Sequence, residues 1–395
     1  EYTRIQRQQD VISRLAGENL EGARVIRAFS KQDSEIEQFQ QAGDTLSDIT
    51  IRVGKLSAAL NPITSVIANL AIVAIVWFGG LFAQDGGIEQ GQIIAMVNYM
   101  TQTLLALIVL ANIIVILTKA LASAKRVSEV LAQESSMPEP RQSAAEKPGA
   151  PRIEFESVRF AYPDAGEDAV EGVSFSIQPG QTLVIIGGTG CGKTTLVRLL
   201  TRDYYVTGGA VRLDGTDVRE YTSRRLHAKI GLVPQAAQLF SGTVRDNLRW
   251  GRQDATDEEI AEACRIACAD EFIGRLSDGY DTELGQGGVN VSGGQKQRLC
   301  IARAILKRPK VLILDDSTSA VDTATEARIR QRLAESLPGM TKIIIAQRVS
   351  SVVHADKIII MEDGRILAEG THTSLLAGNA VYQEIYQSQQ EGVGL

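Results

Sequence analysis

The sequence has no excess of basic residues. Its 395 residues include 41 Lys and Arg against 47 Asp and Glu, which gives a net charge of -6 at pH 7. A chain without a basic excess has little with which to neutralise a phosphate backbone, so we expect no nucleic-acid partner. The chain begins at Glu1 with neither an initiator methionine nor a signal peptide, and we expect it to be part of a longer protein.

Cysteine is also scarce, which excludes a disulfide-based fold. The four cysteines are Cys191, Cys264, Cys268 and Cys300, and none of them forms a C-x-x-C pair. Cys264 and Cys268 could share one face of a helix, but two thiols without a nearby histidine are a weak metal site. We expect reduced thiols in cytosolic segments.

Lys and Arg are missing altogether from residues 56–118, and two long apolar segments lie in this gap. Residues of about 61–83 and 92–117 are dominated by aliphatic side chains. Each segment exceeds the roughly 20 helical residues that cross a bilayer, whereas a pair of buried helices in a soluble protein would be shorter. We therefore predict two transmembrane helices and an integral membrane protein.

Basic residues flank the outer ends of both predicted spans and set their orientation. Positive charge favours the cytoplasmic side, so both outer ends are expected in the cytoplasm and the turn over residues 84–91 on the far side of a bacterial-type plasma membrane. Neither span contains a charged residue, which favours a hydrophobic or amphipathic cargo over a small ion. The basic residues are Arg52, Lys55, Lys119, Lys125 and Arg126.

Composition divides the chain into three parts. Residues 1–132 are predicted to form a partial all-α transmembrane domain, whose first part is a cytosolic helical extension. Residues 133–151 are rich in Pro, Ala, Ser and Glu without a hydrophobic period, and are predicted to be a linker. Over residues 152–395, apolar strands alternate with helical patterns, which predicts an α/β domain with a parallel, helix-covered sheet and antiparallel additions.

The strongest motif is G-x-x-x-x-G-K-[ST], which lies directly between a predicted strand and a predicted helix. Its glycines let backbone N–H groups close around phosphates, Lys193 reaches the outer phosphates, and the Thr194 hydroxyl binds Mg²⁺. Asp315 follows the apolar strand 311–314 and is predicted to reach the same Mg²⁺. The predicted phosphate-binding residues are Gly187, Gly188, Thr189, Gly190, Cys191, Gly192, Lys193, Thr194 and Thr195.

Between these motifs lies Val291-Ser292-Gly293-Gly294-Gln295, where the chain resembles the ABC transporter family. The family signature is usually L-S-G-G-Q, and Val291 replaces its leucine. The resemblance implies an α/β P-loop ATPase domain in which Ser292, Gly293, Gly294 and Gln295 face ATP held by a partner domain. The segment before the first predicted span resembles an exporter loop, so the resemblance covers the whole chain and implies that four earlier spans are missing.

Further positions match the family one by one. Tyr162 matches the aromatic residue that stacks on adenine, and Gln235 matches the glutamine that contacts Mg²⁺ and senses the membrane domain. Asp322, within residues 319–322, fits the loop that communicates across the dimer. A short coupling helix, which in exporters docks on the partner's ATP-binding domain, is expected near residues 23–30.

Two departures from the family fall on one nucleotide site. Asp316 stands where the family has a glutamate as general base, and Gln347 stands where it has a histidine that contacts the γ-phosphate. A catalytic group misplaced by about 1 Å can cost roughly 10²-fold in rate. The pattern resembles the degenerate half of a heterodimeric exporter, whose partner supplies the intact Glu and His.

These observations and the family resemblance predict that the chain is one half of a dimeric ABC exporter, which drives export with ATP and Mg²⁺. The partner half is expected to be a different chain, so that the exporter is a heterodimer. Two readings stay open beside it: a soluble ABC ATPase of DNA repair or translation, and a regulatory membrane subunit that does not transport. The apolar hairpin counts against the first. The cargo, whether drug, lipid or peptide, does not follow from the sequence.

Overall fold

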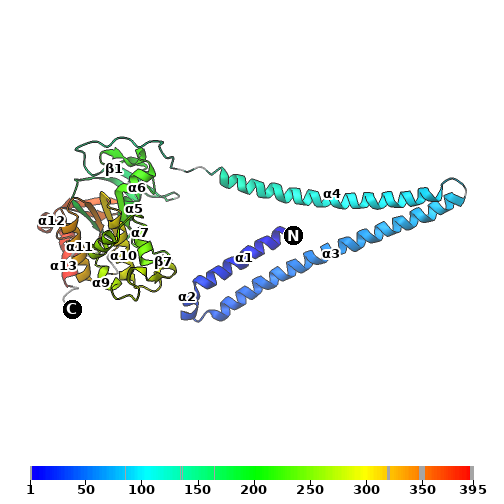
Figure 1. The fold of residues 1–395 in the computed structure, drawn as a ribbon, viewed down its shortest axis with the longest axis horizontal. Coiled ribbons are helices and arrows are strands. Elements are labelled where there is room, and N and C mark those ends of the chain that lie inside the picture. Colours follow the sequence, from blue (N-terminus) through cyan, green and yellow to red (C-terminus); the bar gives the residue numbers. More distant parts are fainter. Residues whose placement is uncertain are drawn as a thin grey trace. The chain divides into compact units, whose positions relative to one another are not determined.

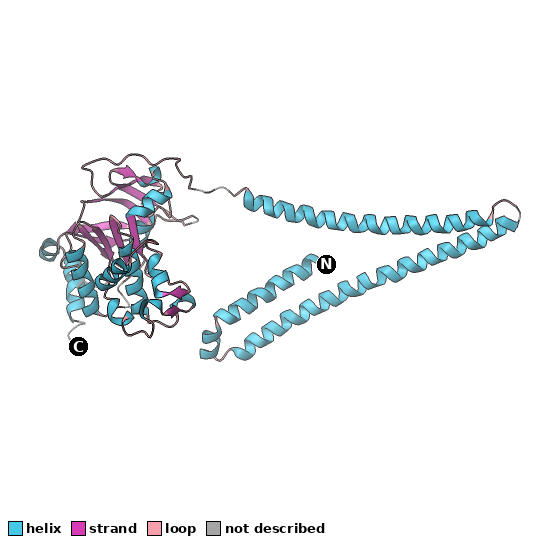
Figure 2. Ribbon diagram, in the orientation of Figure 1, coloured by secondary structure: helices cyan, strands magenta, loops and turns pink. Residues whose placement is uncertain are grey.

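A computed structural model of the chain describes residues 2–84, 86–133, 135, 137–163, 165–317, 321–346 and 352–391. The chain divides into two compact units, Glu1–Glu134 and Ser135–Leu395. The first is helical and the second combines helices with sheets (Figure 2). The two fold types that the sequence predicts therefore occupy separate units.

The first unit is built from two long helices and two shorter ones. Helix α1 runs beside α3, and the Gln8 Nε2 amide donates a hydrogen bond of 3.1 Å to the carbonyl of Ala42. The short helix α2 lies within the stretch where the sequence predicts a coupling helix (Figure 1). The helices are α1 (Tyr2–Glu21), α2 (Ala23–Ala28), α3 (Gln32–Gln84) and α4 (Gln90–Leu131).

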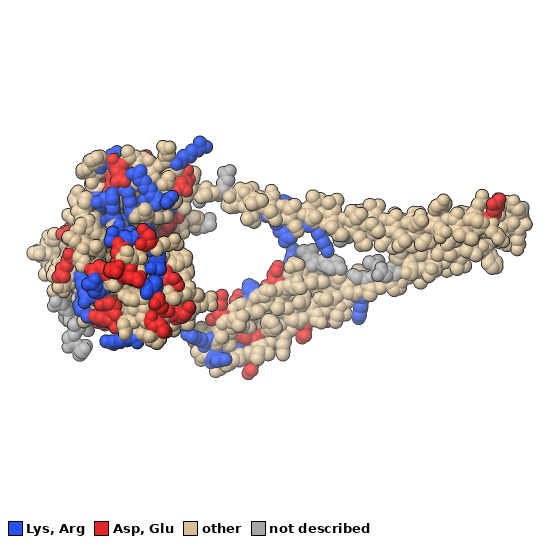
Figure 3. All heavy atoms as spheres, viewed as in Figure 1, with Lys and Arg blue, Asp and Glu red and all other residues tan. Residues whose placement is uncertain are grey.

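Helices α3 and α4 form an antiparallel hairpin around a short turn (Figure 1). The stretches Pro62–Gln84 and Gln90–Leu131 are long and apolar enough to cross a membrane. Their large apolar side chains are exposed in the unit, as at Trp77, and Figure 3 shows almost no charge on this part of the hairpin. Side chains of this kind are stable when lipid covers them.

Two local features adapt the hairpin to an apolar environment. The hydroxyls of Thr101, Thr103 and Thr118 each donate to the carbonyl four residues earlier, at 2.9, 2.7 and 2.7 Å, so none needs a partner outside its helix. At Gly79, a Cβ would lie 3.1 Å from Cγ1 of Ile93 on α4. A small residue therefore lets the two helices approach closely.

The second unit contains a six-stranded sheet in the order β12-β11-β3-β10-β9-β6. Its five strands from β11 to β6 are parallel and β12 is antiparallel, as the sequence predicts. The strands are β3 (Thr182–Gly187), β6 (Ile230–Val233), β9 (Val311–Asp315), β10 (Thr341–Ile345), β11 (Lys357–Glu362) and β12 (Arg365–Gly370).

Two smaller sheets complete the strands of this unit. One is antiparallel with the order β2-β1-β4-β5, and the other pairs β7 with β8. Their strands are β1 (Ile153–Phe160), β2 (Val170–Ile177), β4 (Gly208–Leu213), β5 (Thr216–Asp217), β7 (Gly242–Thr243) and β8 (Glu283–Leu284).

The parallel strands are buried on both faces, which explains their unbroken apolar runs. On β3, Leu183 and Ile185 pack into a core shared with the antiparallel sheet, whereas Val184 and Ile186 pack into a second core with α10. The helices of the unit are α5 (Lys193–Leu200), α6 (Ser223–Lys229), α7 (Val244–Arg249), α8 (Asp257–Ile266), α9 (Asp270–Ile273), α10 (Gly293–Leu306), α11 (Thr323–Ser336), α12 (His372–Gly378) and α13 (Ala380–Glu391).

The second half of the predicted linker is folded onto this unit. Residues 138–150, which we name the clasp, bind through backbone and side chains: the Ala144 amide donates to Glu220 O at 3.0 Å, and Thr216 Oγ1 donates to Ala145 O at 2.7 Å. Glu146 pairs with Lys229 at 2.6 Å and with two further cations. The Lys229 hydrogen bond is the main cause that lowers the pKa of Glu146 to about 2.

Candidate nucleotide-binding site

The predicted phosphate loop connects the end of β3 to the start of α5. Gly187, Gly190 and Gly192 have φ values of +153°, +85° and +96°, which favour glycine. A Cβ on Gly192 would lie 2.7 Å from the carbonyl oxygen of Ala169. Gly192 is also the N-cap of α5, so the loop ends at a helix N-terminus, where free backbone N–H groups attract anions.

Lys193 folds back over this loop. Its Nζ donates to the carbonyl oxygens of Gly187 and Gly188 at 2.9 and 2.5 Å. A lysine held in this way keeps its ammonium above the loop, where it can bind the outer phosphates of a nucleotide. The four cysteines are free and buried, Cys191 of this loop among them.

Thr194 and Asp315 meet at the carboxyl edge of the parallel sheet. Thr194 Oγ1 donates to Asp315 Oδ1 at 3.2 Å, and the aspartate is only 6% exposed. Burial raises the pKa of Asp315, while the hydrogen bond from Thr194 and the charges of Arg198 and Lys193 act against that rise. A hydroxyl and a carboxylate side by side are the oxygen ligands that Mg²⁺ prefers.

Asp316, which follows Asp315, forms a hydrogen bond with Gln235. Gln235 Nε2 donates to Asp316 Oδ2 at 3.3 Å, and the Asp316 amide donates to Ile345 O at 3.1 Å. Asp316 is buried and has a φ of +47°, an uncommon value for a residue with a side chain. Gln347, the other atypical residue, lies outside the described residues.

Tyr162 lies over the start of α5. Its Oη is 3.1 Å from Thr195 Oγ1 and receives a hydrogen bond of 3.4 Å from Arg198 Nη1. Its ring makes edge contacts with Phe160 and Tyr204 at centroid distances of 4.9 and 5.2 Å. Sequence reasoning missed Arg198, although its spacing of three residues from Thr195 places both on one face of a helix.

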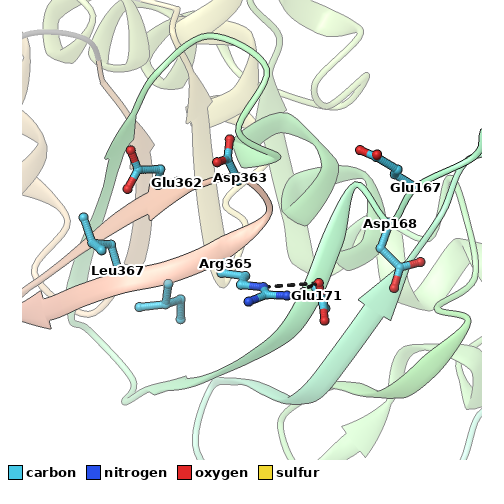
Figure 4. Close-up of a pocket in the computed structure, with 8 residues that line it drawn as sticks. Glu167, Asp168, Glu171, Glu362, Asp363, Arg365 and Leu367 are labelled. Carbon is cyan, nitrogen blue, oxygen red and sulfur yellow. Dashed lines mark hydrogen bonds and ion pairs between the residues drawn. The ribbon is translucent and has the colours of Figure 1, made fainter.

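An acidic hollow of about 670 Å³ lies next to the phosphate loop, where the turn between β11 and β12 meets the strand β2 (Figure 4). Arg365 of this hollow pairs with Glu171 at 2.6 Å. Carboxylates repel a triphosphate, so the phosphates belong at the loop and not here. The acidic side chains are Glu167, Asp168, Glu171, Glu362 and Asp363.

The signature residues begin helix α10. Ser292 is its N-cap, and the Ser292 amide donates to Gln295 Oε1 at 2.8 Å while Ser292 Oγ accepts from the Gln295 amide. Ser292 and Gly293 are exposed, whereas Val291 packs into the core. A core position suits valine as well as the leucine that is usual in the family signature. An exposed serine followed by two glycines at a helix start offers N–H groups to an anion.

Asp322 caps helix α11. Its carboxylate accepts from the Thr325 amide at 2.9 Å, and this bond lowers the pKa of Asp322. The predicted communication loop 319–322 is described only from residue 321 onwards. Among the described residues, no group of three or more His, Cys, Asp or Glu side chains could hold a metal, so Mg²⁺ would rely on oxygens that include Thr194 and a nucleotide.

Comparison with known families separates the same two units. Residues 170–319 match the profile of the ABC transporter family, and residues 3–134 match that of the ABC transporter transmembrane region. A solved structure of a bacterial Atm1-family ABC exporter with ATP bound is similar over 98% of this chain and 69% of that chain, with 28% identity and a TM-score of 0.85.

Several curated proteins are similar over nearly the whole chain. An ABC transporter ATP-binding protein of Mycobacterium tuberculosis is 40% identical over 98% of this chain and 67% of its own length. One from Bacillus subtilis is 38% identical with the same two coverages. A fatty acid ABC transporter ATP-binding/permease protein of Mycobacterium tuberculosis is 38% identical over 93% of this chain and 58% of its own length.

Proposed function

This chain belongs to the ABC transporter family, as an exporter-type polypeptide that joins a transmembrane region to an ATP-binding domain, and we propose that it works as one half of a dimeric ATP-driven exporter. The observation that carries the proposal is the pair Thr194–Asp315 beside a glycine loop that ends at a helix N-terminus. The same polypeptide carries two helices long and apolar enough to cross a membrane. Nucleotide binding can therefore act on lipid-embedded helices.

We propose that Mg²⁺ accompanies the nucleotide. Thr194, Asp315 and Gln235 would hold it, and the ion would neutralise charge on the phosphates. Gln235 donates to Asp316, the residue that directly follows Asp315. This chain's own residues then supply the rest: Lys193 binds the outer phosphates, and the α5 N-terminus binds the others.

We further propose that this chain's own P-loop hydrolyses ATP slowly. Asp316 is one methylene shorter than glutamate, and its carboxylate already accepts from Gln235. Its backbone is fixed by the bond to Ile345, so the shorter side chain cannot advance toward an attacking water without moving β9. Gln347 in place of histidine weakens the same site, while the binding residues stay intact.

The partner under this proposal is a second exporter half with an intact glutamate and histidine. Ser292 and the residues up to Gln295 would cap the ATP that the partner holds, so that the partner's site turns over. Each chain would then contribute one P-loop and one signature. The ATP-binding unit would lie in the cytoplasm, and α2 would dock on the partner's ATP-binding domain.

The cargo is proposed to be amphipathic or hydrophobic. The predicted spans contain no Lys or Arg, and their polar groups include the amides of Asn98, Gln102 and Asn112. These amides would either line the cargo path or bind neighbouring helices. The name of one relative specifies a fatty acid, and a long-chain carboxylate is a cargo of the proposed class.

The test compares variants in the purified complex of this chain with its partner, by steady-state ATP turnover. We expect Asp316→Ala to leave most of the turnover, and Ser292→Ala to remove most of it. Thr256→Ala is the matched control for Ser292→Ala, because Thr256 caps α8 in a capping box of the same kind. It should preserve turnover.

The proposed asymmetry is wrong if Asp316→Ala lowers turnover as much as a change of the partner's catalytic glutamate does. A complex that binds ATP but moves no cargo into vesicles would instead point to a regulatory subunit. A complex that binds no ATP although Lys193 is intact would contradict the whole proposal.

A further inference from the structure

The hydroxyl of Tyr162 is held by two side chains of helix α5. Thr195 Oγ1 lies 3.1 Å from it, and Arg198 Nη1 donates to it at 3.4 Å. Thr195 is buried and Arg198 is exposed, so the phenol oxygen contacts one side chain from the protein interior and one from the solvent-exposed surface. The phenol oxygen therefore has two defined partners before any nucleotide arrives.

The ring of Tyr162 is fixed separately from its hydroxyl. Phe160 and Tyr204 contact it at interplanar angles of 80° and 85°, which are edge contacts typical of aromatic clusters. Tyr162 is itself only partly buried, so part of the ring remains accessible. The side chain is thus held at both ends and still exposes a surface on which a base can stack.

Arg198 has no part in the core of the domain. Arg202, one turn later, shows the contrast: it is buried and its guanidinium binds the carbonyls of Val218 and Tyr221 and the hydroxyl of Ser223. Arg202 therefore stabilises the fold. Arg198 instead reaches from the exposed face of α5 to Tyr162.

We propose that Arg198 is a positioning residue of the nucleotide site, which holds the Tyr162 ring in the orientation that stacks on adenine. This inference rests on the proposed role of Tyr162 as the adenine platform. A side chain ordered before binding loses less conformational freedom when the ligand arrives, so the affinity for the base rises. The triphosphate binds the loop and not the ring, so it should sense only the loss of the Arg198 charge, which also acts on Asp315.

The experiment measures Mg²⁺-dependent affinity for ATP and for tripolyphosphate on the full chain in detergent. The variants are Arg198→Ala, Tyr162→Phe and the double variant, since phenylalanine keeps the ring and loses only the hydroxyl. We expect Arg198→Ala to weaken ATP binding about threefold more than it weakens tripolyphosphate binding, the size typical of an exposed charged hydrogen bond. The double variant should match Tyr162→Phe in the ratio of these two affinities.

Three outcomes would overturn the inference: unchanged ATP affinity in Arg198→Ala, an equal loss for tripolyphosphate, or additive changes of the affinity ratio in the double variant. Arg275→Ala, a change at another exposed arginine of the same unit, is the control and should have no effect. Thermal unfolding of each variant checks that the fold is intact. If the unaltered chain bound neither ligand, the proposed function would fail, and this is distinct from a failure of the role of Arg198.

Discussion

At the scale of single residues, the site combines groups that favour the fold with groups that oppose it. Gly192 is needed where it lies, because its φ of +96° and the nearby Ala169 carbonyl leave no space for a Cβ. Asp315 is the opposite case, since burial raises the pKa of its carboxyl. Folding therefore disfavours the ionised form, which is the form that Mg²⁺ requires.

Asp315→Asn should make the nucleotide-free chain more stable while it abolishes Mg²⁺-dependent ATP binding. Because the pKa of Asp315 is raised in the folded state, the free energy of unfolding falls as the pH rises through that pKa. At neutral pH the ionised carboxylate therefore destabilises the fold, and asparagine removes this effect. Asparagine can still accept from Thr194. We expect the thermal midpoint to rise by about 2–4 °C, measured without nucleotide.

The matched control is Asp322→Asn, where the sign reverses. The hydrogen bond from the Thr325 amide lowers the pKa of Asp322, so its charge favours the folded state at neutral pH. This change should lower the midpoint or leave it alone. A lower midpoint for Asp315→Asn than for the unaltered chain would show that the buried carboxylate stabilises the fold.

At the scale of elements, the clasp shows how polar residues without a hydrophobic period become ordered. Glu146 lies among Lys229, Lys310 and Arg225, and Asp214 pairs with Lys229 and Arg152 beside it. These charges satisfy one another where the clasp meets the domain. We therefore expect residues 138–150 to stay folded as long as the ATP-binding unit does and to unfold together with it.

Glu146→Gln should destabilise the ATP-binding unit in a manner that depends on pH. The pKa of Glu146 is lowered from 4.5 to about 2, mainly by the hydrogen bond from Lys229. Its contribution is therefore complete above about pH 4.5 and is lost as the pH falls toward 2. At pH 7 we expect a loss of about 2 kcal/mol, as for hydrogen bonds to charged groups.

The measurement is thermal unfolding of the full chain and the variant across pH 3 to 7. The difference between them should be constant from pH 5 upward and shrink below pH 4.5. Glu384→Gln, at an exposed position, is the control and should show no such difference. No difference between Glu146→Gln and the unaltered chain at any pH would mean that the clasp is held by its backbone bonds alone. A difference that did not change with pH would mean that the charge of Glu146 plays no part.

Much of the second unit could be predicted from the sequence because its strands are buried on both faces. The run Val311 to Leu314 reads as a strand, and β9 spans Val311–Asp315. Lys357 to Leu367 fold as β11 and β12 around Asp363 and Gly364, which adopt positive φ values, and Asp-Gly is a common turn sequence between two strands.

Features that depend on tertiary contacts could not be predicted. The clasp holds through backbone amides and ion pairs to residues far along the chain, and neither leaves a periodic pattern. The bond between Arg198 and Tyr162 joins positions 36 residues apart. The phosphate loop, by contrast, was predictable, because a strand, a glycine-rich turn and a helix must follow one another in sequence.

At the scale of the whole molecule, one polypeptide carries a membrane hairpin and an ATP-binding unit, and it spans 67% of the length of its relative from Mycobacterium tuberculosis. Lipid is the environment that suits the exposed apolar side chains of α3 and α4. The proposed work of the pair is closure of two ATP-binding units around nucleotide. In the proposed dimer, this chain retains its ATP while its partner turns over.

Single-turnover hydrolysis by the purified complex, loaded with two ATP molecules and sampled over time, tests this asymmetry most directly. The account predicts two phases of equal amplitude: a fast one from the partner's site and a slow one from this chain's P-loop, separated by about 10²-fold in rate. Replacing Asp316 with Glu and Gln347 with His together should accelerate the slow phase only. A single phase that consumes both ATP molecules at one rate would contradict the account.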